Sequence, residues 1–138
     1  MSVECFLDTN VLVYSVSGAA ADGRKKERAL ELVLHADFGL SAQVLQEFYV
    51  TVTRKISKPL LPDEAVAFLD EYRHFPCLQT DYPLIVAGIE TSLRFGLSYW
   101  DGTILAAADA LGAKILYSED FSHGQRYGTV VVVNPFLE

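Results

Sequence analysis

The sequence predicts an α/β fold: a three-layer α/β/α sandwich around a mostly parallel five-stranded sheet. Short apolar runs alternate with amphipathic segments in the order β-α-α-β-α-α-β-α-α-β-β, and strands separated by helices pair in parallel through crossover connections. Apolar runs such as Val130–Val133 carry no polar alternation, which is typical of a sheet covered on both faces. No linker or internal repeat interrupts this order, so residues 1–138 are expected to form one domain.

The N-terminal quarter is predicted to supply one strand and two helices. Residues 3–7 form a short apolar run typical of a buried strand. The polar triplet 8–10 can cap a short helix that follows it. After a small-residue loop over 18–23, apolar positions recur at helical spacing over about 24–35 and predict a second helix.

The next elements include one segment with conflicting signals. Residues 38–40 form a minimal strand, and Ser41 is a candidate N-cap for the helix after it. Within the span 43–55, β-branched residues at 49–53 favour a strand, whereas apolar side chains recur at helical spacing. We predict a helix there, and a further helix over about 61–72 with proline in its first turn.

The second half of the chain is predicted to contain three strands and two helices. Residues 76–79 are a short strand, and a helix over 81–95 ends at Gly96. An alanine-rich helix covers 101–111. The last elements are, in order, a strand over 114–117, a loop over 118–128 and a strand over 129–133.

Composition indicates a globular protein. Hydrophobic residues make up 51% of the chain, which argues against disorder. No apolar run reaches the ~18 residues of a membrane span, and no basic segment followed by an apolar core suggests a signal peptide. Cys5 and Cys77 lack metal-type spacing and are expected to be buried free thiols. Together these features predict a reducing, cytoplasmic location.

The distribution of charge leaves two interpretations of the basic residues open. A net charge of −7 argues against a nucleic-acid partner, although divalent cations bound to acidic groups would reduce it. Most basic residues nevertheless lie in two clusters, Arg24, Lys25, Lys26 and Arg28, and Arg54, Lys55 and Lys58. Solvated helix faces are the simpler interpretation. Cations at the start of a helix oppose its dipole, however, which favours a role in binding nucleic-acid phosphates.

Four acidic residues point to the chemistry of the protein. They are Asp8, Glu47, Asp101 and Asp120. Asp8 and Asp120 follow predicted strands and Asp101 opens a predicted helix, so they are expected at the edge of the sheet where α/β proteins bind ligands. Each alone could be a cap, a turn residue or a solvated side chain. Several carboxylates at one edge would need a cation, and oxygen ligands suit Mg²⁺ or Mn²⁺.

Four segments, in this order and spacing, give the chain a family resemblance. They are residues 6–14, residues 41–48, Tyr99-Trp100-Asp101 and residues 116–121. In these segments the chain resembles PIN domains, and specifically VapC-type toxin ribonucleases of bacterial toxin–antitoxin pairs, over nearly its whole length. The resemblance implies that Asp8, Glu47, Asp101 and Asp120 are the metal-binding catalytic acids, supported by Asn10 and Ser118. Ser118 stands where a threonine is common and keeps the hydroxyl group.

The resemblance also implies an activity, cofactors and partners. The expected activity is hydrolysis of RNA phosphodiester bonds by an endoribonuclease with one or two Mg²⁺ or Mn²⁺ ions. No second acid lies close to Asp101 in its helix, so a second metal position stays open, while Glu119 is an additional neighbouring carboxylate. A homodimer and a cognate antitoxin protein are implied as well. An apolar partner surface is expected to include Phe38, Leu60 and Leu61.

Other side chains near the acids are assigned mainly structural roles. His35, His74 and His123 are scattered and show no metal-ligand spacing, so no general-base histidine is predicted. Tyr99 and Trp100 are expected to pack at a helix start, with stacking on an RNA base as the alternative.

Two other functions stay open at this point. A phospho-receiver domain would use Asp81 after the third strand, but the last strand lacks the lysine that such a domain needs. A non-catalytic RNA-binding PIN domain is the other alternative, and the presence of all four acids argues against it.

Overall fold

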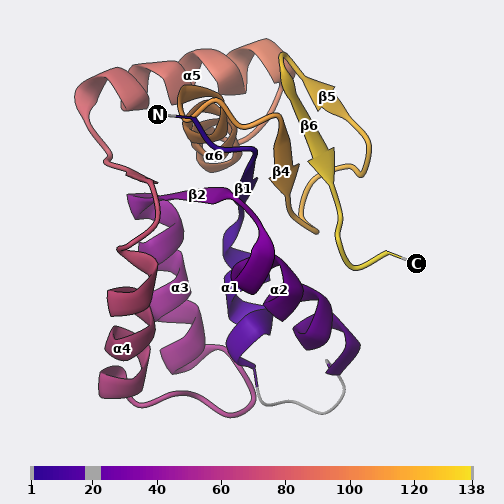
Figure 1. Ribbon diagram of the computed structural model, residues 1–138. Coiled ribbons are helices and arrows are strands. Elements are labelled where there is room, and N and C mark those ends of the chain that lie inside the picture. The colour runs from indigo at the N-terminus through magenta and orange to yellow at the C-terminus, as the bar shows by residue number, and fades with distance from the viewer. Residues whose placement is uncertain (1, 18–22, 138) are drawn as a thin grey trace.

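The computed structural model describes residues 2–17 and 23–137 (Figure 1). In chain order the elements are β1 (Cys5–Leu7), α1 (Thr9–Val16), α2 (Gly23–His35), β2 (Phe38–Ser41), α3 (Ala42–Arg54), α4 (Pro62–Tyr72), β3 (Cys77–Leu78), α5 (Tyr82–Phe95), α6 (Tyr99–Ala110), β4 (Ile115–Tyr117), β5 (Arg126–Tyr127) and β6 (Val130–Val133). The loop predicted over 18–23 falls largely outside the described residues, and Gly23 already begins α2. No helix in the described part of the chain is long and apolar enough to cross a membrane.

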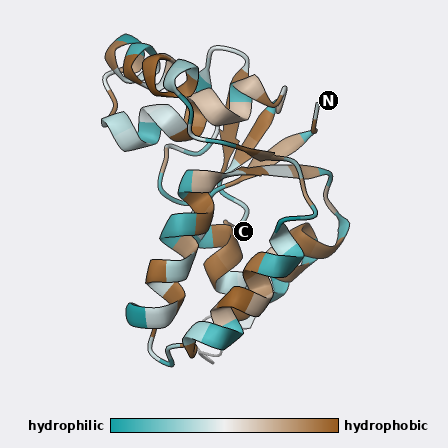
Figure 2. Ribbon diagram, turned by 90° about the vertical axis from the view of Figure 1, so that its left-hand side faces the viewer, coloured by the Kyte–Doolittle hydropathy of each residue, from teal (hydrophilic) through white to brown (hydrophobic). Residues whose placement is uncertain are grey.

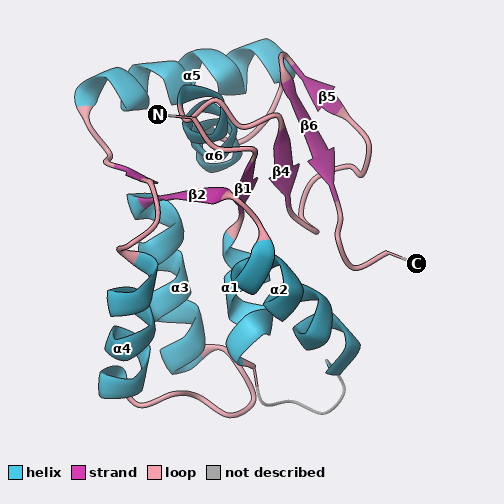
Figure 3. Ribbon diagram, viewed as in Figure 1, coloured by secondary structure: helices cyan, strands magenta, loops and turns pink. Residues whose placement is uncertain are grey.

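The sheet has the strand order β3-β2-β1-β4-β6-β5, and all neighbours are parallel except β5 and β6. Helices α1 to α4 lie on one side of it, and α5 and α6 lie on the other (Figures 1 and 3). The predicted α/β fold is therefore confirmed. From β1 the chain builds outward through β2 and β3, then returns through α5 and α6 to place β4 on the other side of β1. The carboxyl ends of β1 and β4 form the switch point at which such sheets bind ligands.

The strand count differs from the prediction, because the sheet has six strands instead of five. The additional strand, β5, lies in the span 118–128 that was predicted to be a loop. It is two residues long, too short to show alternation, and pairs antiparallel with β6. Gly128, with φ +64°, makes the tight connection between Tyr127 and Val130, because such hairpin turns require positive φ.

The segment with conflicting propensities is helical, as predicted. The Ser41 hydroxyl accepts a hydrogen bond of 3.3 Å from the backbone N–H of Val44 and caps α3. Val44, Phe48 and Val52 recur every four residues and are fully buried. Burial of this stripe outweighs the strand preference of the β-branched residues.

Helix α6 begins two residues earlier than predicted. The hydroxyl of Ser98 accepts a hydrogen bond of 3.1 Å from the backbone N–H of Asp101, so Ser98 is the N-cap and Tyr99 the first helical residue. Asp101 consequently lies in the first turn, where a carboxylate interacts favourably with the helix dipole. At the preceding helix, Gly96 ends α5 with φ +66°, as the sequence predicted.

The core corrects one expectation about the surface. Figure 2 shows the central strands mostly apolar and the helices in front mixed in hydropathy. Phe38, expected on an exposed partner surface, is 1% exposed and stacks on Phe75 with ring centroids 4.1 Å apart. Strand β2 has neighbours on both edges and all four of its residues are buried. Leu61 is exposed, Cys5 is buried and Cys77 is half-buried, and both cysteines are free thiols.

Candidate metal centre

Asp8 follows β1 directly and is 6% exposed. Its Oδ1 accepts a hydrogen bond of 2.8 Å from the backbone N–H of Thr9, and its Oδ2 accepts one of 2.7 Å from the hydroxyl of Ser118. The carboxylate is thus both the N-cap of α1 and a member of the pocket. Burial raises the pKa of Asp8 to about 6, and the charges of Asp120 and Glu47 add to this effect. The two hydrogen bonds oppose it without cancelling it.

Ser118 connects three parts of the site. It follows β4, is fully buried, and besides donating to Asp8 it accepts from the Asn10 side-chain amide at 3.3 Å. Its oxygen also accepts from the backbone N–H of Asp120 at 3.0 Å. A small hydroxyl group suits this position because it donates once and accepts twice. The ends of β1 and β4 and the start of α1 are therefore linked through one side chain.

The two acids after Ser118, Glu119 and Asp120, have different hydrogen-bond partners. The Asn10 amide donates to Oδ2 of Asp120 at 3.1 Å. Glu119 instead accepts from the Tyr14 hydroxyl at 2.7 Å and from Nζ of Lys25 at 3.0 Å. The backbone N–H of Glu119 also donates to Oδ1 of Asn10 at 3.4 Å. Both acids line the acidic pocket, where Asp120 is held by Asn10 and the charge of Glu119 is matched by a lysine of α2.

Glu47 and Asp101 approach the same pocket from two helices on opposite sides of the sheet. Glu47 projects from the middle of α3, and its Oε1 accepts a hydrogen bond of 3.0 Å from the Thr9 hydroxyl. Asp101 lies in the first turn of α6. Burial raises the pKa of Asp101, and the nearby charge of Asp120 contributes to the increase.

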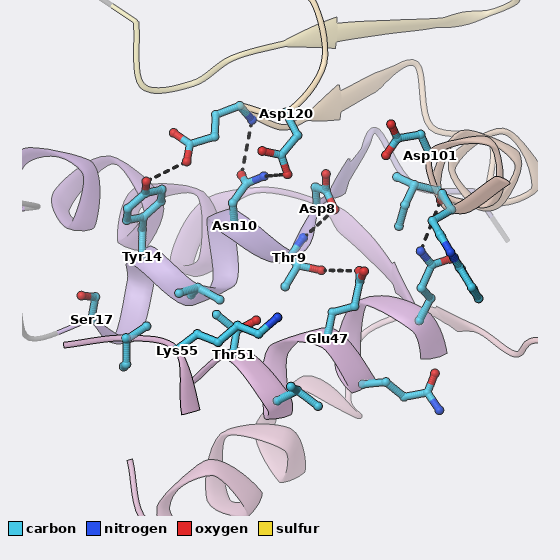
Figure 4. A pocket seen from close by; sticks show the side chains of 18 of the residues that line it. Asp8, Thr9, Asn10, Tyr14, Ser17, Glu47, Thr51, Lys55, Asp101 and Asp120 are labelled. Atoms are coloured by element: carbon cyan, nitrogen blue, oxygen red, sulfur yellow. Dashed lines mark hydrogen bonds between the residues drawn. The ribbon is translucent and has the colours of Figure 1, made fainter. Parts of the chain in front are cut away.

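All four predicted acids line one pocket of about 750 Å³ at the switch point (Figure 4). The remaining walls contain polar side chains such as Gln43 and Thr51, and apolar ones such as Val13, Ile56 and Ile104. Within residues 2–17 and 23–137, however, no three His, Cys, Asp or Glu side chains converge closely enough to form a preassembled metal site. The acids share a pocket without yet being arranged as ligands of one ion.

The donor set nevertheless fits a hard divalent cation. It consists of carboxylates, and such ions prefer oxygen ligands. The raised pKa of Asp8 reflects burial and negative charge that a cation would compensate. Each Asp8 oxygen accepts one hydrogen bond and retains a further lone pair. Mg²⁺ commonly keeps several waters and binds directly to only one or two carboxylates, so three converging acids are not required.

Four of the seven predicted basic residues line one of two pockets. Of the seven, Lys55 lines the acidic pocket. Arg24, Lys25 and Arg28 line a second pocket of about 460 Å³ beside Phe136. Lys25 pairs with Glu119, and Arg28 lies 3.6 Å from Glu31 and donates to the Pro135 carbonyl. This cluster therefore has a structural role that its composition did not reveal.

Sequence reasoning missed the polar side chains that hold the acids. Thr9 fixes Glu47, and Tyr14 with Lys25 fixes Glu119. Tyr14 stands one helical turn after Asn10, a spacing that could have indicated a shared face of α1. The described lining of the acidic pocket contains no histidine, and Nδ1 of His123 accepts from the Asn134 backbone N–H.

Comparison with known proteins identifies the family. A family model described as PIN domain matches residues 5–126, and the chain belongs to the PIN-domain family. No curated protein matches the sequence. The match to the PIN-domain family model confirms the family resemblance and rules out the phospho-receiver alternative. Asp81, the phosphoacceptor proposed in that alternative, caps α5 through a 3.0 Å hydrogen bond from Leu84 N and does not line the acidic pocket.

Several solved structures share the fold. FitAB bound to an IR36 DNA fragment matches with a TM-score of 0.71 and 21% identity over 97% of this chain and 96% of that chain. A toxin–antitoxin complex from Klebsiella pneumoniae matches at 0.69 and 18% over 96% and 98%. Mycobacterium tuberculosis VapC20, a sarcin–ricin loop cleaving toxin, matches at 0.66 and 20% over 85% and 90%. At these identities the likeness shows a common fold.

Proposed function

We propose that this chain is a metal-dependent endoribonuclease and the toxin of a toxin–antitoxin pair. The observation that carries the proposal is the set of four carboxylates, Asp8, Glu47, Asp101 and Asp120, lining one pocket at the switch point of a PIN-domain sheet. The fold shared with VapC20, described as a sarcin–ricin loop cleaving toxin, supports the substrate class.

The four acids would hold one or two Mg²⁺ or Mn²⁺ ions. Such an ion supplies charge neutralisation for the anionic transition state of phosphodiester hydrolysis and a more acidic water. The chain's own contribution is orientation of the carboxylates. Asp8 is fixed by Thr9 and Ser118, and Asp120 by Asn10. Fixed polar groups lower the reorganisation needed during the reaction.

The proposed partners come from the structural neighbours and the family. Toxin–antitoxin complexes among the structural neighbours support a cognate antitoxin, and a homodimer and a cytoplasmic location follow from the same assignment. With Phe38 buried, the partner surface needs another location. Tyr82, Ile85, Ile89 and Leu93 are exposed along one face of α5 and offer apolar area for a protein contact.

Cleavage of RNA by the purified chain tests the activity. We expect hydrolysis with Mg²⁺ or Mn²⁺, none with EDTA, and none in the Asp8→Ala, Asp101→Ala double variant. An Asp70→Ala, Glu90→Ala double variant removes two exposed acids outside the pocket and is the matched control. Equal cleavage in EDTA and in the pocket variant would refute the proposal. Mapping RNA 5′ ends in cells expressing the parent or Asp8→Asn would then identify the target.

A non-catalytic RNA-binding PIN domain remains the second candidate. It is favoured by the finding that no three potential ligands converge among the described residues. Binding of RNA without metal-dependent cleavage would select this function.

A further inference from the structure

The separation of Glu47 and Asp101 depends on how α3 and α6 are held relative to each other. Glu47 lies in the middle of α3, and Asp101 lies in the first turn of α6 (Figure 4). In the part of the chain that the structure describes, each hydrogen bond between these two helices involves Gln43. Gln43 is therefore the polar link between the two helices that carry these acids.

The link uses both ends of the Gln43 amide. Nε2 of Gln43 donates to the backbone carbonyl of Trp100 at 3.3 Å, and Oε1 accepts from the Thr103 hydroxyl at 2.6 Å. The Thr103 oxygen also lies 2.7 Å from the Trp100 carbonyl oxygen, so its single hydrogen is shared between two acceptors. The donor and the acceptor of one amide are thus fixed on the same turn of α6.

This contact lies beside both acids. On α6, Trp100 immediately precedes Asp101, and Thr103 follows it by two positions. On α3, Gln43 stands four residues before Glu47, so the two side chains share a helix face about 6 Å apart along the axis. A shift of either helix that broke the link would change the distance between the two carboxylates.

The α6 end of the link is buried. Thr103 is 6% exposed, and its methyl group packs on Gly88 of α5, since a Cβ at Gly88 would meet it. A hydroxyl group at such a position requires partners within the protein, because water does not reach it. Gln43 is half-buried and lines the acidic pocket. The link therefore connects the pocket wall to the packed interface of α5 and α6.

We propose that Gln43 is a positioning residue of the metal centre: by joining α3 to α6 it fixes the separation of Glu47 and Asp101, and with it the affinity for Mn²⁺ or Mg²⁺. This inference rests on the metal-dependent function proposed above and adds a residue that acts through the acids. The acids come from separate elements, so a metal site depends on how those elements are held. Groups that orient metal ligands typically contribute about 10–100-fold to metal affinity.

Gln43→Met tests the link directly, because it keeps the length of the side chain and removes both polar ends. Calorimetric titration well below the melting temperature should show a Mn²⁺ dissociation constant about tenfold or more above that of the parent. Gln79→Met is the matched control, at an exposed position outside the pocket, and should bind Mn²⁺ like the parent. Parent affinity in Gln43→Met would overturn the proposal.

Variants of Thr103 separate positioning from stability. Thr103→Val removes the hydroxyl group and keeps the methyl group that packs on α5, so it should weaken Mn²⁺ binding as Gln43→Met does. Thr103→Ser keeps the hydroxyl group and loses the methyl group, so it should melt at a lower temperature and bind Mn²⁺ like the parent. Affinities that followed the melting temperatures would mean a merely structural role and would overturn the proposal.

The double variant Gln43→Met, Thr103→Val should lose little more affinity for Mn²⁺ than Gln43→Met alone, because both changes remove the same link. Additive losses would show two independent effects and would overturn the proposal. Hydrogen exchange in EDTA gives a readout without the ion. The backbone amides of Gly102 and Thr103 should exchange faster in Gln43→Met than in the parent, and unchanged exchange would also count against the link.

RNA cleavage separates this role from binding of the substrate. Gln43→Met should need more Mn²⁺ for half-maximal cleavage, and at saturating Mn²⁺ its KM for RNA should equal that of the parent. A raised KM under those conditions would assign Gln43 to the substrate and overturn the proposal. Weaker Mn²⁺ binding in Gln43→Met, with no cleavage by the parent at any Mn²⁺ concentration, would refute the ribonuclease function and keep the positioning role.

Discussion

The hydroxyl of Ser118 donates a 2.7 Å hydrogen bond to Oδ2 of Asp8 and joins the carboxyl ends of β1 and β4. The two residues are 110 positions apart in the chain. Each lies at the end of its own strand, on the two sides of the switch point. The contact holds the most buried acid of the pocket at the position where the two halves of the sheet meet, so one hydrogen bond links the sheet to the acidic pocket.

Ser118→Ala should destabilise the protein by about 1–3 kcal/mol, because it leaves the buried carboxylate of Asp8 without its side-chain donor and removes the shared acceptor of the Asn10 and Asp120 N–H groups. Loss of the donor should also raise the pKa of Asp8 further. The shift in the urea denaturation midpoint measures the effect. Ser122→Ala, at an exposed position of the same loop, is the control and should be close to neutral. A Ser118→Ala variant as stable as the parent would show that this hydrogen bond is dispensable.

The metal-free protein should become less stable as the pH rises through the titration range of Asp8. Burial raises the pKa of Asp8 from 3.8 to about 6, so between these values the native state binds a proton that the unfolded state has released. The penalty is absent below pH ~4 and complete above pH ~6, and amounts to about 3 kcal/mol at most. Urea denaturation in EDTA at several pH values would measure it. Asp8→Asn should remove this component, and identical pH profiles for both proteins would contradict the assignment.

Addition of Mn²⁺ should raise the melting temperature of the parent by more than that of Asp101→Asn. A ligand that binds the native state alone stabilises it, and loss of one carboxylate weakens that binding. In EDTA, without the ion, Asp101→Asn should melt at a higher temperature than the parent. Because burial and the charge of Asp120 raise the pKa of Asp101, neutralising this residue should raise the melting temperature by up to a few degrees. Equal Mn²⁺ shifts in both proteins would mean that Asp101 contributes nothing to a metal site.

Lys25→Met should increase the affinity for Mn²⁺ a few-fold, because it removes a positive charge that offsets Glu119 beside the acidic pocket. The ion pair is partly exposed, so its contribution to stability should be below about 1 kcal/mol. Calorimetric titration with Mn²⁺ at low salt gives the comparison. Lys26→Met removes the same charge one position later and serves as the control. If both variants bind Mn²⁺ alike, the Lys25–Glu119 pair does not influence the site.

The acids were predictable because each belongs to a local pattern that the fold brings to one edge. Asp8 follows an apolar run that becomes β1, and Asp101 opens the alanine-rich segment that becomes α6. Parallel strands carry their carboxyl ends to the same side, so local patterns sufficed to predict a common pocket. The distances between the acids did not follow, because they depend on Thr9, Asn10 and other side chains that orient the carboxylates.

The features that the sequence did not reveal have a different origin. The Lys25–Glu119 contact spans 94 positions, and nothing near Lys25 indicates its partner. Phe38 was expected on the surface because a strand of three or four residues does not reveal whether one or both of its faces are covered. Strand β5 is too short to carry any pattern, and only its pairing with β6 defines it. In each case the deciding interaction is remote in the sequence.

The close packing of α5 against α6 places Asp101, and it should not tolerate a methyl group at Gly102. A Cβ there would lie 2.6 Å from the Gly88 carbonyl oxygen and 2.9 Å from the Ser92 backbone nitrogen. These are backbone atoms, so the helices would have to separate. Gly102→Ala should therefore destabilise the protein by about 1–3 kcal/mol, and displacement of the adjacent Asp101 should reduce cleavage.

Gly23→Ala is the control: nothing lies within 4 Å of its Cβ position, and it should be neutral or stabilising by about 0.4–1 kcal/mol. Urea denaturation and cleavage rates of both variants measure the two effects, and a Gly102→Ala variant that matches Gly23→Ala in both would mean that α6 can shift without disturbing the acids.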